Sequence, residues 1–592
     1  MKSMTNPLQK KAANRLRAPA PIRVILCHQT GKFRMISIVS QSTRAFCLSA
    51  FRYSILGTTA VLFVVLSTAS SIAQTTVATN SKNAHAQTIA NLLEELDRTR
   101  TPNGTEISPD GHTVAWVAAL KGSGSRIHLT RLNDTAASPR MISIPGLRAE
   151  AARPCSEDDV TWSPNGKQIA FLSDCATPGQ KQVFLANQDL SESGSQAAPA
   201  AIRQLTALKG FVRSLAWSPD GRQIGFLFVQ NATRRPSASA AIEPKIGVIG
   251  ASTLAEIQRV AVVDAAQGSN RMPELIQVTP ENLHVYEFDW SPNSRDLAYV
   301  AATPPGDDNW WVAQLYTQAV AGGTPTSILK PSMQIGVPRW SPDGKRIAFI
   351  GGLMSDQGVI GGDVYVISAA GGRAKNLTPD RRSSATSPYW IGGHRLGLTE
   401  IVGGDFRFSI IDASTGVEDK SARVTLPATV GQFSLSLSSN DGSRSKNAAT
   451  EVTAAFVKST FNEPPEVWAG PLKNLVQITH LNDSLKPDWG KSQSLTWNNE
   501  GFQIQGWLVF PKNYDPQKKY PLIVWVHGGP TSQVMPRWPR AGYNPIAFST
   551  LNYFVLMPNP RGSYGGGEAF TRANRRDFGY GDLRDILAGV DV

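Results

Sequence analysis

A His-Gly-Gly-Pro run at residues 527–530 directly follows an apolar stretch, residues 522–526. Glycine has no side chain, so another group can approach its backbone closely. Backbone N–H groups in such a loop can stabilise the negative oxygen that forms when a carbonyl is attacked, which is the chemistry of acyl transfer. We therefore predict that Gly528 or Gly529 is an oxyanion-hole donor. The alternative is a tight strand-to-helix turn without a chemical role, and His527 is predicted to be a structural residue of the loop.

Serine acyl transfer also requires a nucleophile, a base, and an acid that orients the base. The turn that presents such a serine has the pattern Gly-x-Ser-x-Gly, and this pattern does not occur in the 592 residues. In the run Gly562-Ser563-Tyr564-Gly565 the first glycine directly precedes the serine. Ser563 is therefore not predicted to be a nucleophile, and no catalytic residue is assigned in this chain.

Two cysteines are candidates for a disulfide. Cys155 and Cys175 each lie ten residues from Asn165, which is the centre of a predicted hairpin turn. Antiparallel pairing would place the two cysteines opposite each other if the register holds. Two buried thiols are the alternative. No metal site is predicted, because no histidine or further cysteine lies near them in the sequence.

The first 73 residues have the features of an export signal. They contain ten Lys and Arg but no Asp or Glu, and an apolar run from Ile55 to Leu66 precedes small residues that end at Ala73. This order is typical of a cleaved secretory signal, and the apolar run is shorter than the roughly 20 residues that span a bilayer. We predict a leader and signal peptide at 1–73, a linker at 74–90, and a periplasmic or secreted protein. The alternative is an inner-membrane protein anchored by residues 55–73.

The leader also carries most of the formal net charge of +13. Without its ten basic residues, 49 of the 59 Lys and Arg remain against 46 Asp and Glu, a net charge of +3. A nearly neutral folded part argues against a nucleic-acid-binding protein. Membrane contact is expected only through an uncleaved leader.

A short phrase recurs between residues 91 and 482 at intervals of 50 to 73 residues. Its copies are Ile107-Ser-Pro-Asp-Gly111, Trp162-Ser-Pro-Asn-Gly166, Trp217-Ser-Pro-Asp-Gly221, Trp290-Ser-Pro-Asn-Ser294, Trp340-Ser-Pro-Asp-Gly344 and the degenerate Trp390-Ile-Gly-Gly393. Pro, Asp or Asn, and Gly favour a tight turn between strands, and repeats of this length with about four strands each indicate a β-propeller. Six copies and an eroded unit at 435–470 predict seven blades, with six or eight as alternatives. The tryptophans are predicted to pack between blades.

The pattern changes after the repeats. Residues 522–526 and 553–557 are near-continuous apolar strands separated by helical stretches, which predicts a mostly parallel sheet covered on both faces. Residues 582–592 place four apolar side chains on one helical face. About 100 residues are too few for a whole α/β domain of roughly 200–250. We therefore predict that residues 483–592 are the N-terminal part of an incomplete α/β-hydrolase domain.

An ordered set of phrases in this region resembles the prolyl oligopeptidase family of serine peptidases, in the branch of acylaminoacyl-peptidases and bacterial dipeptidyl peptidases. The phrases are Gly506-Trp507-Leu508, Tyr520-Pro521-Leu522-Ile523, His527-Gly528-Gly529-Pro530, Asn559-Pro560-Arg561-Gly562-Ser563, Gly567-Glu568-Ala569-Phe570 and Gly581-Asp582-Leu583-Arg584-Asp585. The resemblance implies an exported serine peptidase for short peptides, whose propeller limits access and which needs no metal or organic cofactor. Family order implies that the nucleophile, acid and base follow Val592, so the chain as given is predicted to be inactive.

Two other functions remain open. Similar propellers occur in a periplasmic binding module, the Tol-system propeller protein, and an esterase could use the same fold. Dipeptidyl peptidases of the family bind the substrate amine through a glutamate pair in an Asp-Trp-x-Tyr-Glu-Glu-like segment. The corresponding run here, Asp308-Asn309-Trp310-Trp311, lacks the glutamates. The missing glutamates argue against a dipeptidyl peptidase IV-type specificity and leave acylaminoacyl-peptidase-like or other oligopeptidase activity open. The choice between exopeptidase and endopeptidase activity also stays open.

Overall fold

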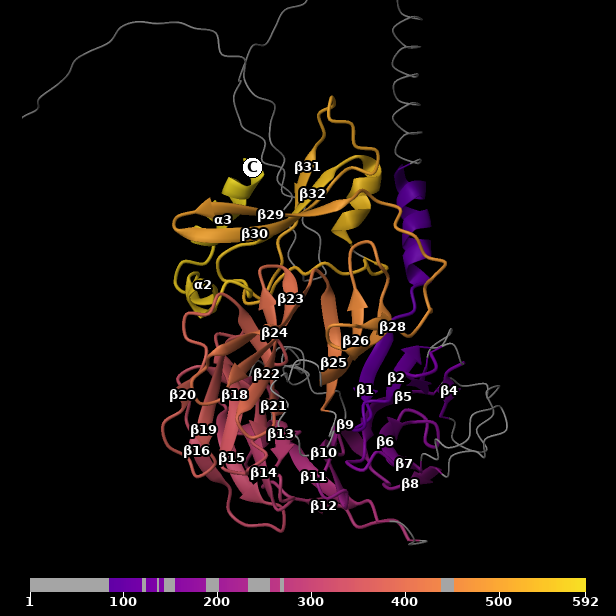
Figure 1. Ribbon diagram of the computed structural model, residues 1–592, viewed down its shortest axis with the longest axis vertical. Helices are drawn as coiled ribbons and strands as arrows, with labels where there is room; N and C mark the ends of the chain where they lie inside the picture. The colour runs from indigo at the N-terminus through magenta and orange to yellow at the C-terminus, as the bar shows by residue number, and fades with distance from the viewer. Residues whose placement is uncertain are drawn as a thin grey trace, which may run out of the picture.

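The structure is a computed structural model that describes residues 85–119, 124–135, 138–142, 155–187, 202–232, 256–266, 271–437, 452–542 and 544–592. The expected leader and most of the expected linker lie outside these residues. None of the described helices has the length and apolar character needed to cross a membrane. Figure 1 shows a large group of strands below a smaller C-terminal layer.

The described part of residues 102–477, here called the propeller region, forms seven antiparallel sheets of four strands, and the strands of each sheet are consecutive in the chain. The first four sheets comprise β1 (Pro102–Ile107), β2 (Thr113–Ala119), β3 (Ser125–Arg131), β4 (Arg140–Met141); β5 (Glu157–Trp162), β6 (Gln168–Ser173), β7 (Gln182–Asn187), β8 (Ile202–Gln204); β9 (Gly210–Trp217), β10 (Gln223–Gln230), β11 (Gln258–Asp264), β12 (Ile276–Gln277); and β13 (His284–Trp290), β14 (Asp296–Ala302), β15 (Gln314–Ala319), β16 (Thr326–Leu329), with the short helix η1 (Asp307–Val312) between β14 and β15. The other three comprise β17 (Gln334–Trp340), β18 (Arg346–Gly352), β19 (Asp363–Ser368), β20 (Lys375–Asn376); β21 (Ser384–Ile391), β22 (Arg395–Val402), β23 (Asp405–Asp412), β24 (Glu418–Leu426); and β25 (Thr429–Leu437), β26 (Val452–Ser459), β27 (Glu466–Pro471), β28 (Val476–Gln477).

The recurring phrase forms the turn between the first two strands in five of these sheets. In the second sheet, Ser163 Oγ accepts a hydrogen bond from Gln168 N–H at 2.9 Å, and Asn165 Oδ1 accepts one from Lys167 N–H at 3.0 Å. Gly166 has a φ of 69°, which glycine adopts without strain. The same serine and Asp or Asn bonds recur in the other four copies. These turns are therefore closed by the side chains of the phrase itself.

Tryptophans of the phrase join neighbouring sheets. The indole N–H of Trp217 donates to the carbonyl of Thr161 at 3.3 Å, and that of Trp290 donates to the carbonyl of Ala216 at 3.2 Å. Trp162 and Trp390 donate in the same way to the preceding sheets. The seventh sheet packs in turn on the first, because Ile107 and Val114 share an apolar cluster with Ala455 and Val467. The same indole contact thus links four of the sheets to the sheet that precedes each, whereas the buried indole N–H of Trp340 in the fifth sheet has no partner among the described residues.

The C-terminal region, residues 492–592, forms a smaller sheet with the order β29-β30-β32-β31. Its elements are β29 (Ser492–Asn499), β30 (Phe502–Val509), β31 (Leu522–Val524), η3 (Pro545–Leu551), β32 (Phe554–Asn559), α2 (Glu568–Arg572) and α3 (Gly581–Val590). β31 and β32 are parallel, whereas β30 is antiparallel to both β29 and β32. The prediction of a mostly parallel sheet is therefore wrong for the described strands, because the hairpin β29–β30 extends the sheet from one edge.

A helix at residues 85–97 belongs with this layer. Its Leu92 and Leu96 are buried in one apolar cluster with Trp489, Trp507 and Val555. Figure 1 shows the indigo helix standing beside the C-terminal layer rather than among the seven sheets. The segment that joins the expected linker to the expected propeller therefore packs against the C-terminal region.

The predicted apolar face of the last helix points outward. Leu583, Leu587 and Val590 of α3 are exposed, while Asp585 and Gly589 are buried on the opposite side. A side chain at position 589 would meet the ring of Trp497 in β29. The helix therefore packs on the sheet through its small and charged residues.

Candidate active site

The loop that follows β31, residues 527–531, is here called the glycine loop. Gly528 and Gly529 are both exposed, and within the described part of the chain neither backbone N–H has a hydrogen-bond acceptor. Gly529 has a φ of 150°, and a Cβ there would lie 2.9 Å from the nitrogen of Thr531. A Cβ at Gly528 would meet nothing within 4 Å. Both glycines of the loop are thus exposed, and their N–H groups are not used by other parts of the chain that the structure describes.

His527 holds the start of this loop. Its Nε2 lies 2.9 Å from Ser563 Oγ, and its Nδ1 lies 3.3 Å from the carbonyl oxygen of Gly528. Burial lowers the pKa of His527, and the hydrogen bond with the Gly528 carbonyl opposes this shift. The imidazole is therefore neutral at neutral pH.

The pairing of His527 with Ser563 was not predicted from the sequence. The two residues follow β31 and β32, and these parallel neighbours end at the same edge of the sheet. This shared edge was the signal in the sequence that could have revealed the pair. Ser563 is only 1% exposed, so its hydroxyl is closed to a substrate. The structure therefore gives Ser563 the role of a buried partner of His527.

The other end of the glycine loop is held by the propeller region. The Oγ of Ser355 accepts a hydrogen bond from Thr531 N–H at 2.8 Å and also pairs with Thr531 Oγ1. Ser355 belongs to the segment between β18 and β19, residues 353–362, here called the propeller loop. The Tyr564 hydroxyl donates to the carbonyls of Leu353 and Val359 in the same loop at 3.3 and 3.0 Å. The propeller loop thus contacts the segments that carry both Gly529 and Ser563.

A buried glutamate lies in this interface. Glu568 Oε1 accepts a hydrogen bond from Leu353 N–H at 3.2 Å, while its buried Oε2 has no partner among the described residues. Burial raises the pKa of Glu568 to about 7; the Leu353 N–H opposes this shift, and nearby Asp363 adds to it. The carboxyl is therefore close to half-protonated at neutral pH.

Arg561 fixes the segment that precedes Ser563. Its guanidinium donates two hydrogen bonds to the carboxylate of Asp585 in α3, at 2.9 and 2.7 Å, and its backbone N–H donates a third at 2.9 Å. Glu500 forms a further ion pair with Arg561 at 2.9 Å. The bonds to Asp585 raise the pKa of Arg561 above its usual value. Arg561 is thus a structural link between the loop after β32, helix α3 and the turn between β29 and β30.

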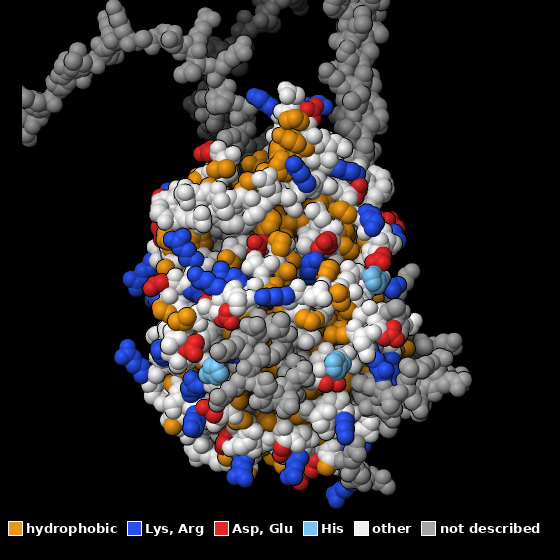
Figure 2. All heavy atoms as spheres, in the orientation of Figure 1, with side chains coloured by type: hydrophobic (Ala, Val, Ile, Leu, Met, Phe, Trp, Pro, Cys, Tyr) orange, Lys and Arg blue, Asp and Glu red, His pale blue; other side chains and the backbone are white. Residues whose placement is uncertain are grey.

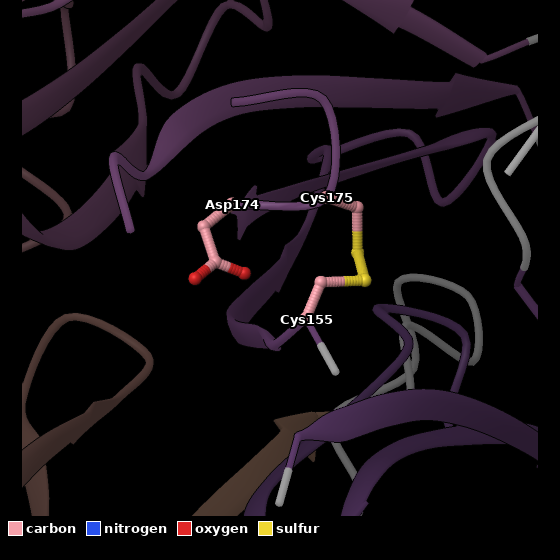
Figure 3. A group of neighbouring side chains, drawn as sticks. All are labelled: Cys155, Asp174 and Cys175. Atoms are coloured by element: carbon pink, nitrogen blue, oxygen red, sulfur yellow. A yellow bond between two sulfur atoms is a disulfide. The ribbon is translucent and has the colours of Figure 1, made fainter. Parts of the chain in front are cut away.

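Cys155 and Cys175 are joined by a disulfide bond in the structure, with their Cα atoms 4.9 Å apart (Figure 3). Asp174 lies beside them, and these three residues are the one group with the spacing of metal ligands in the described part of the chain. Both sulfurs are used by the disulfide, so no thiolate is available to a metal. The carboxylate of Asp174 accepts a hydrogen bond from Ser156 N–H at 2.6 Å instead.

The propeller region contains an acidic cavity of about 410 Å³ that the sequence did not predict. Glu106, Asp158 and Asp159 line it together with backbone and side-chain groups of β1, β5 and β25. Burial raises the pKa of Glu106 to about 7 and that of Asp159 to about 6. Asp159 also accepts hydrogen bonds from the N–H groups of Ser214 and Leu215 in the next sheet. Asp159 therefore joins the second sheet to the third.

The run Asp308-Asn309-Trp310-Trp311 lies in η1, between β14 and β15. Trp310 is fully buried in the apolar cluster that also contains Met354 of the propeller loop, whereas Trp311 is 38% exposed. The run is thus part of the packing around the propeller loop.

Basic and acidic side chains are interspersed on the face of the molecule shown in Figure 2.

A family model, curated relatives and solved structures each match part of this chain. Residues 539–592 match the prolyl oligopeptidase family. Dipeptidyl-peptidase 5 of Aspergillus oryzae is 26% identical over 277 residues, which is 45% of this chain and 35% of the relative, so the chain spans about a third of that protein's length. A probable dipeptidyl-peptidase 5 of Emericella nidulans is 22% identical over 77% of this chain and 67% of the relative.

Solved structures show the same fold at low sequence identity. The acylaminoacyl peptidase of Pyrococcus horikoshii superposes with a TM-score of 0.58 at 17% identity, over 84% of this chain and 70% of that structure. A puromycin-hydrolysing peptidase of Mycobacterium tuberculosis gives a TM-score of 0.54 at 16% identity, over 84% of this chain and 72% of that structure.

Proposed function

We propose that this chain is part of an exported serine peptidase of the prolyl oligopeptidase family that hydrolyses short peptides. The observation that carries the proposal is the glycine loop. Two exposed backbone donors follow a strand of the C-terminal sheet, and residues of both regions of the protein hold the loop in place.

The glycine loop would act on the carbonyl oxygen of the peptide bond. When a nucleophile attacks that carbonyl, negative charge develops on its oxygen, and the Gly528 and Gly529 N–H groups would bind it. A single donor of this kind contributes about 10²- to 10³-fold in rate. His527, neutral and bonded to Ser563, would position the loop and take no proton from the nucleophile.

The propeller would limit which substrates reach this loop. The propeller loop contacts Thr531 and Tyr564, and Gly565 N–H donates to Ser384 Oγ at the start of β21 at 3.0 Å. We propose that the seven sheets form the complete ring and that the ring lies across the entrance, so that short peptides pass and folded proteins do not. The proposed domain limits are residues 91–482 for the ring and 483–592 for the peptidase part.

The nucleophile, acid and base are proposed to follow Val592, since Gly-x-Ser-x-Gly does not occur in these 592 residues. Reading the gene beyond the codon for Val592 tests this directly. A Gly-x-Ser-x-Gly followed by Asp and His supports the proposal. If the reading frame continues without these residues, the proposed enzymatic activity is wrong and a binding module is favoured.

Substrate class is tested on the protein that carries the nucleophile. We expect that the enzyme cleaves short peptides and that a fluorophosphonate inactivates it. We also expect that it does not cleave a folded protein that contains the same peptide sequences. The absence of the glutamate pair near Trp311 favours substrates with a blocked amino terminus over free dipeptidyl substrates. Hydrolysis of esters without peptides would contradict the peptidase assignment. The 592-residue chain, tested in parallel, should be inactive.

Export is proposed from the leader, with cleavage after Ala73 and a periplasmic or secreted product. The disulfide between Cys155 and Cys175 fits an oxidising compartment. Fractionation and N-terminal sequencing of the expressed protein would test this. A soluble mature protein that begins near residue 74 is the expected result, whereas a membrane-bound protein retaining residues 55–73 would indicate an anchor.

A further inference from the structure

We propose that a proton controls the contact between Glu568 and the propeller loop: the contact is closed while the Glu568 carboxyl is protonated and opens when the carboxyl ionises. Glu568 is the first residue of α2, which lies where the C-terminal layer meets the propeller region (Figure 1). Opening at this contact would separate the two regions of the protein. The contact involves no nucleophile, so it can be tested on this 592-residue chain whether or not the proposed peptidase activity holds.

Two glycine pairs form the base of the propeller loop, residues 351–352 at the end of β18 and residues 361–362 directly before β19. A Cβ at Gly352 would lie 2.9 Å from Glu568 Oε2, and a Cβ at Gly361 would lie 2.6 Å from the ring of Tyr564. A side chain at either position would therefore displace a residue of the C-terminal region. The backbone at the base of the loop thus packs directly on Glu568 and Tyr564, an approach that glycine permits.

The Glu568 carboxyl is only partly satisfied at this contact. Its Oε1 accepts the Leu353 N–H at 3.2 Å, whereas its Oε2 is buried and has no hydrogen-bond partner among the described residues. Arg572 forms an ion pair with Oε1 at 3.8 Å, but the Arg572 side chain is 43% exposed, so solvent screens its charge. A buried carboxylate with one unpaired oxygen is costly, whereas the protonated carboxyl carries no charge to desolvate.

The groups around Glu568 do not offset the cost of its charge. Burial is the main cause that raises the pKa of Glu568 to about 7; the Leu353 N–H opposes the shift, Asp363 of β19 adds to it, and Arg572 opposes it. The carboxylate of Asp363 is itself buried and accepts a hydrogen bond from Asn376 Nδ2 at 2.8 Å. The remaining charged or titratable groups on the elements packed here are Tyr365 on β19, Tyr564 before α2, Asp356 in the propeller loop, and, before β21, the exposed Arg382 and Arg381, whose guanidinium binds Glu400 at 2.6 Å.

Moving the propeller loop away from Glu568 relieves the cost of the charge. Water then reaches Oε2, so the ionised carboxylate favours the open form, whereas the protonated carboxyl does not. The bonds from the Tyr564 hydroxyl to the Leu353 and Val359 carbonyls join uncharged groups and hold the loop closed at low pH. With an ordinary pKa of 4.5 in the open form and a pKa of about 7 in the closed form, the open population rises about tenfold between pH 6 and 8.

Hydrogen exchange of the full chain measures this opening. Protection factors, which are corrected for the intrinsic pH dependence of exchange, are compared at pH 6, 7 and 8 for peptides that cover the propeller loop. We expect the protection of the propeller loop to fall about tenfold from pH 6 to 8 in the wild type. Glu568→Gln keeps an oxygen for the Leu353 N–H but does not ionise, so its protection should stay constant. Asp356→Asn removes an exposed carboxyl from the same loop and is the matched control, which should keep the wild-type pH dependence.

Low concentrations of urea distinguish opening of the propeller loop from unfolding of the whole chain. Exchange through a local opening exposes little surface and so depends weakly on urea, whereas exchange through global unfolding depends on it strongly. We expect the weak dependence for the propeller loop and the strong dependence for β22, which is buried in the next sheet.

Four results would overturn the proposal. The first is a propeller-loop protection factor that does not change with pH in the wild type, a result that needs no variant to fold. The second is a tenfold fall that persists in Glu568→Gln, and the third is loss of the pH dependence in Asp356→Asn, which would assign it to a different carboxyl. The fourth is a urea dependence of the propeller loop as strong as that of β22, because the pH dependence would then report unfolding of the whole chain.

Discussion

The substitution Glu568→Gln is expected to remove a pH-dependent destabilisation from the interface between the propeller and C-terminal regions. The Glu568 side chain is 14% exposed, and its Oε1 accepts a hydrogen bond from Leu353 N–H. Burial raises the pKa of this carboxyl from 4.5 to about 7. Glutamine has nearly the same shape, keeps an oxygen for Leu353 and carries no charge at any pH.

The sign and size follow from the shift. Because the folded-state pKa lies above the unfolded value, the folded protein retains the proton between pH 4.5 and about 7 while the unfolded chain releases it. Each pH unit in this window removes about 1.4 kcal/mol of stability, so the carboxyl destabilises the folded state by about 3 kcal/mol above pH 7. Glu568→Gln should therefore match the wild type near pH 4.5 and exceed its stability by up to about 3 kcal/mol at pH 8.

Urea unfolding at pH 5, 6, 7 and 8 measures this difference. Glu94→Gln, at an exposed side chain of the helix at residues 85–97, is the control and should leave the free energy of unfolding close to that of the wild type. A stability difference between Glu568→Gln and the wild type that stays constant with pH would show that the effect is not due to ionisation. A Glu568→Gln variant less stable than the wild type at pH 8 would refute the assigned burial of the charge.

Three further substitutions test the scaffold. Asp585→Ala leaves the buried Arg561 guanidinium without its main partner and should lower the free energy of unfolding by about 3–5 kcal/mol in urea titrations. Trp217→Phe removes one indole hydrogen bond between sheets and should lower it by about 1 kcal/mol, measured in the same way. Cys155→Ser opens a disulfide with a sequence separation of 20 and should lower the thermal midpoint, with a loss of about 3 kcal/mol.

Each substitution has a control on the same element or bond. Asp582→Asn lies on α3 without a bond to Arg561 and should change stability by less than about 0.5 kcal/mol. Phe226→Leu keeps an apolar side chain in the sheet of Trp217 and tests packing without a hydrogen bond. A reductant should lower the midpoint of the wild type and leave Cys155→Ser unchanged. Equal effects of Asp585→Ala and Asp582→Asn would contradict the role of the Arg561 pair.

Local chemistry explains why the repeats were predictable. The serine and the Asp or Asn of each phrase bond backbone groups only two to five residues away, so the turn forms from its own residues. The strands on either side then pair as a hairpin wherever the phrase occurs. The glycines of the candidate site were found for a similar reason, because a glycine run after an apolar strand is a short-range pattern.

The disulfide depended on more than the spacing of the cysteines. Near the turn, Trp162 pairs with Ile169, a register that would place Cys155 opposite residue 176. A bulge between Asp158 and Thr161 shifts the register by one residue, so that Glu157 pairs with Ser173 and Cys155 lies opposite Cys175. The sequence spacing anticipated this pair, but the bulge that produces it was visible only in the folded sheet.

The sequence by itself thus determined the hairpin turns, their repetition and the glycine run, because each of these is stabilised by residues close together in the chain. The tertiary structure decided which groups hold the glycine loop. His527 meets Ser563 across 36 residues, and Thr531 meets Ser355 across 176, because the ends of parallel strands and a loop of a distant sheet converge there. The tertiary structure also decided that the apolar face of α3 points outward. Asp585 binds the buried Arg561, so the face of α3 that carries Asp585 lies against the sheet. Contacts of this range depend on how the sheets pack, which no local pattern specifies.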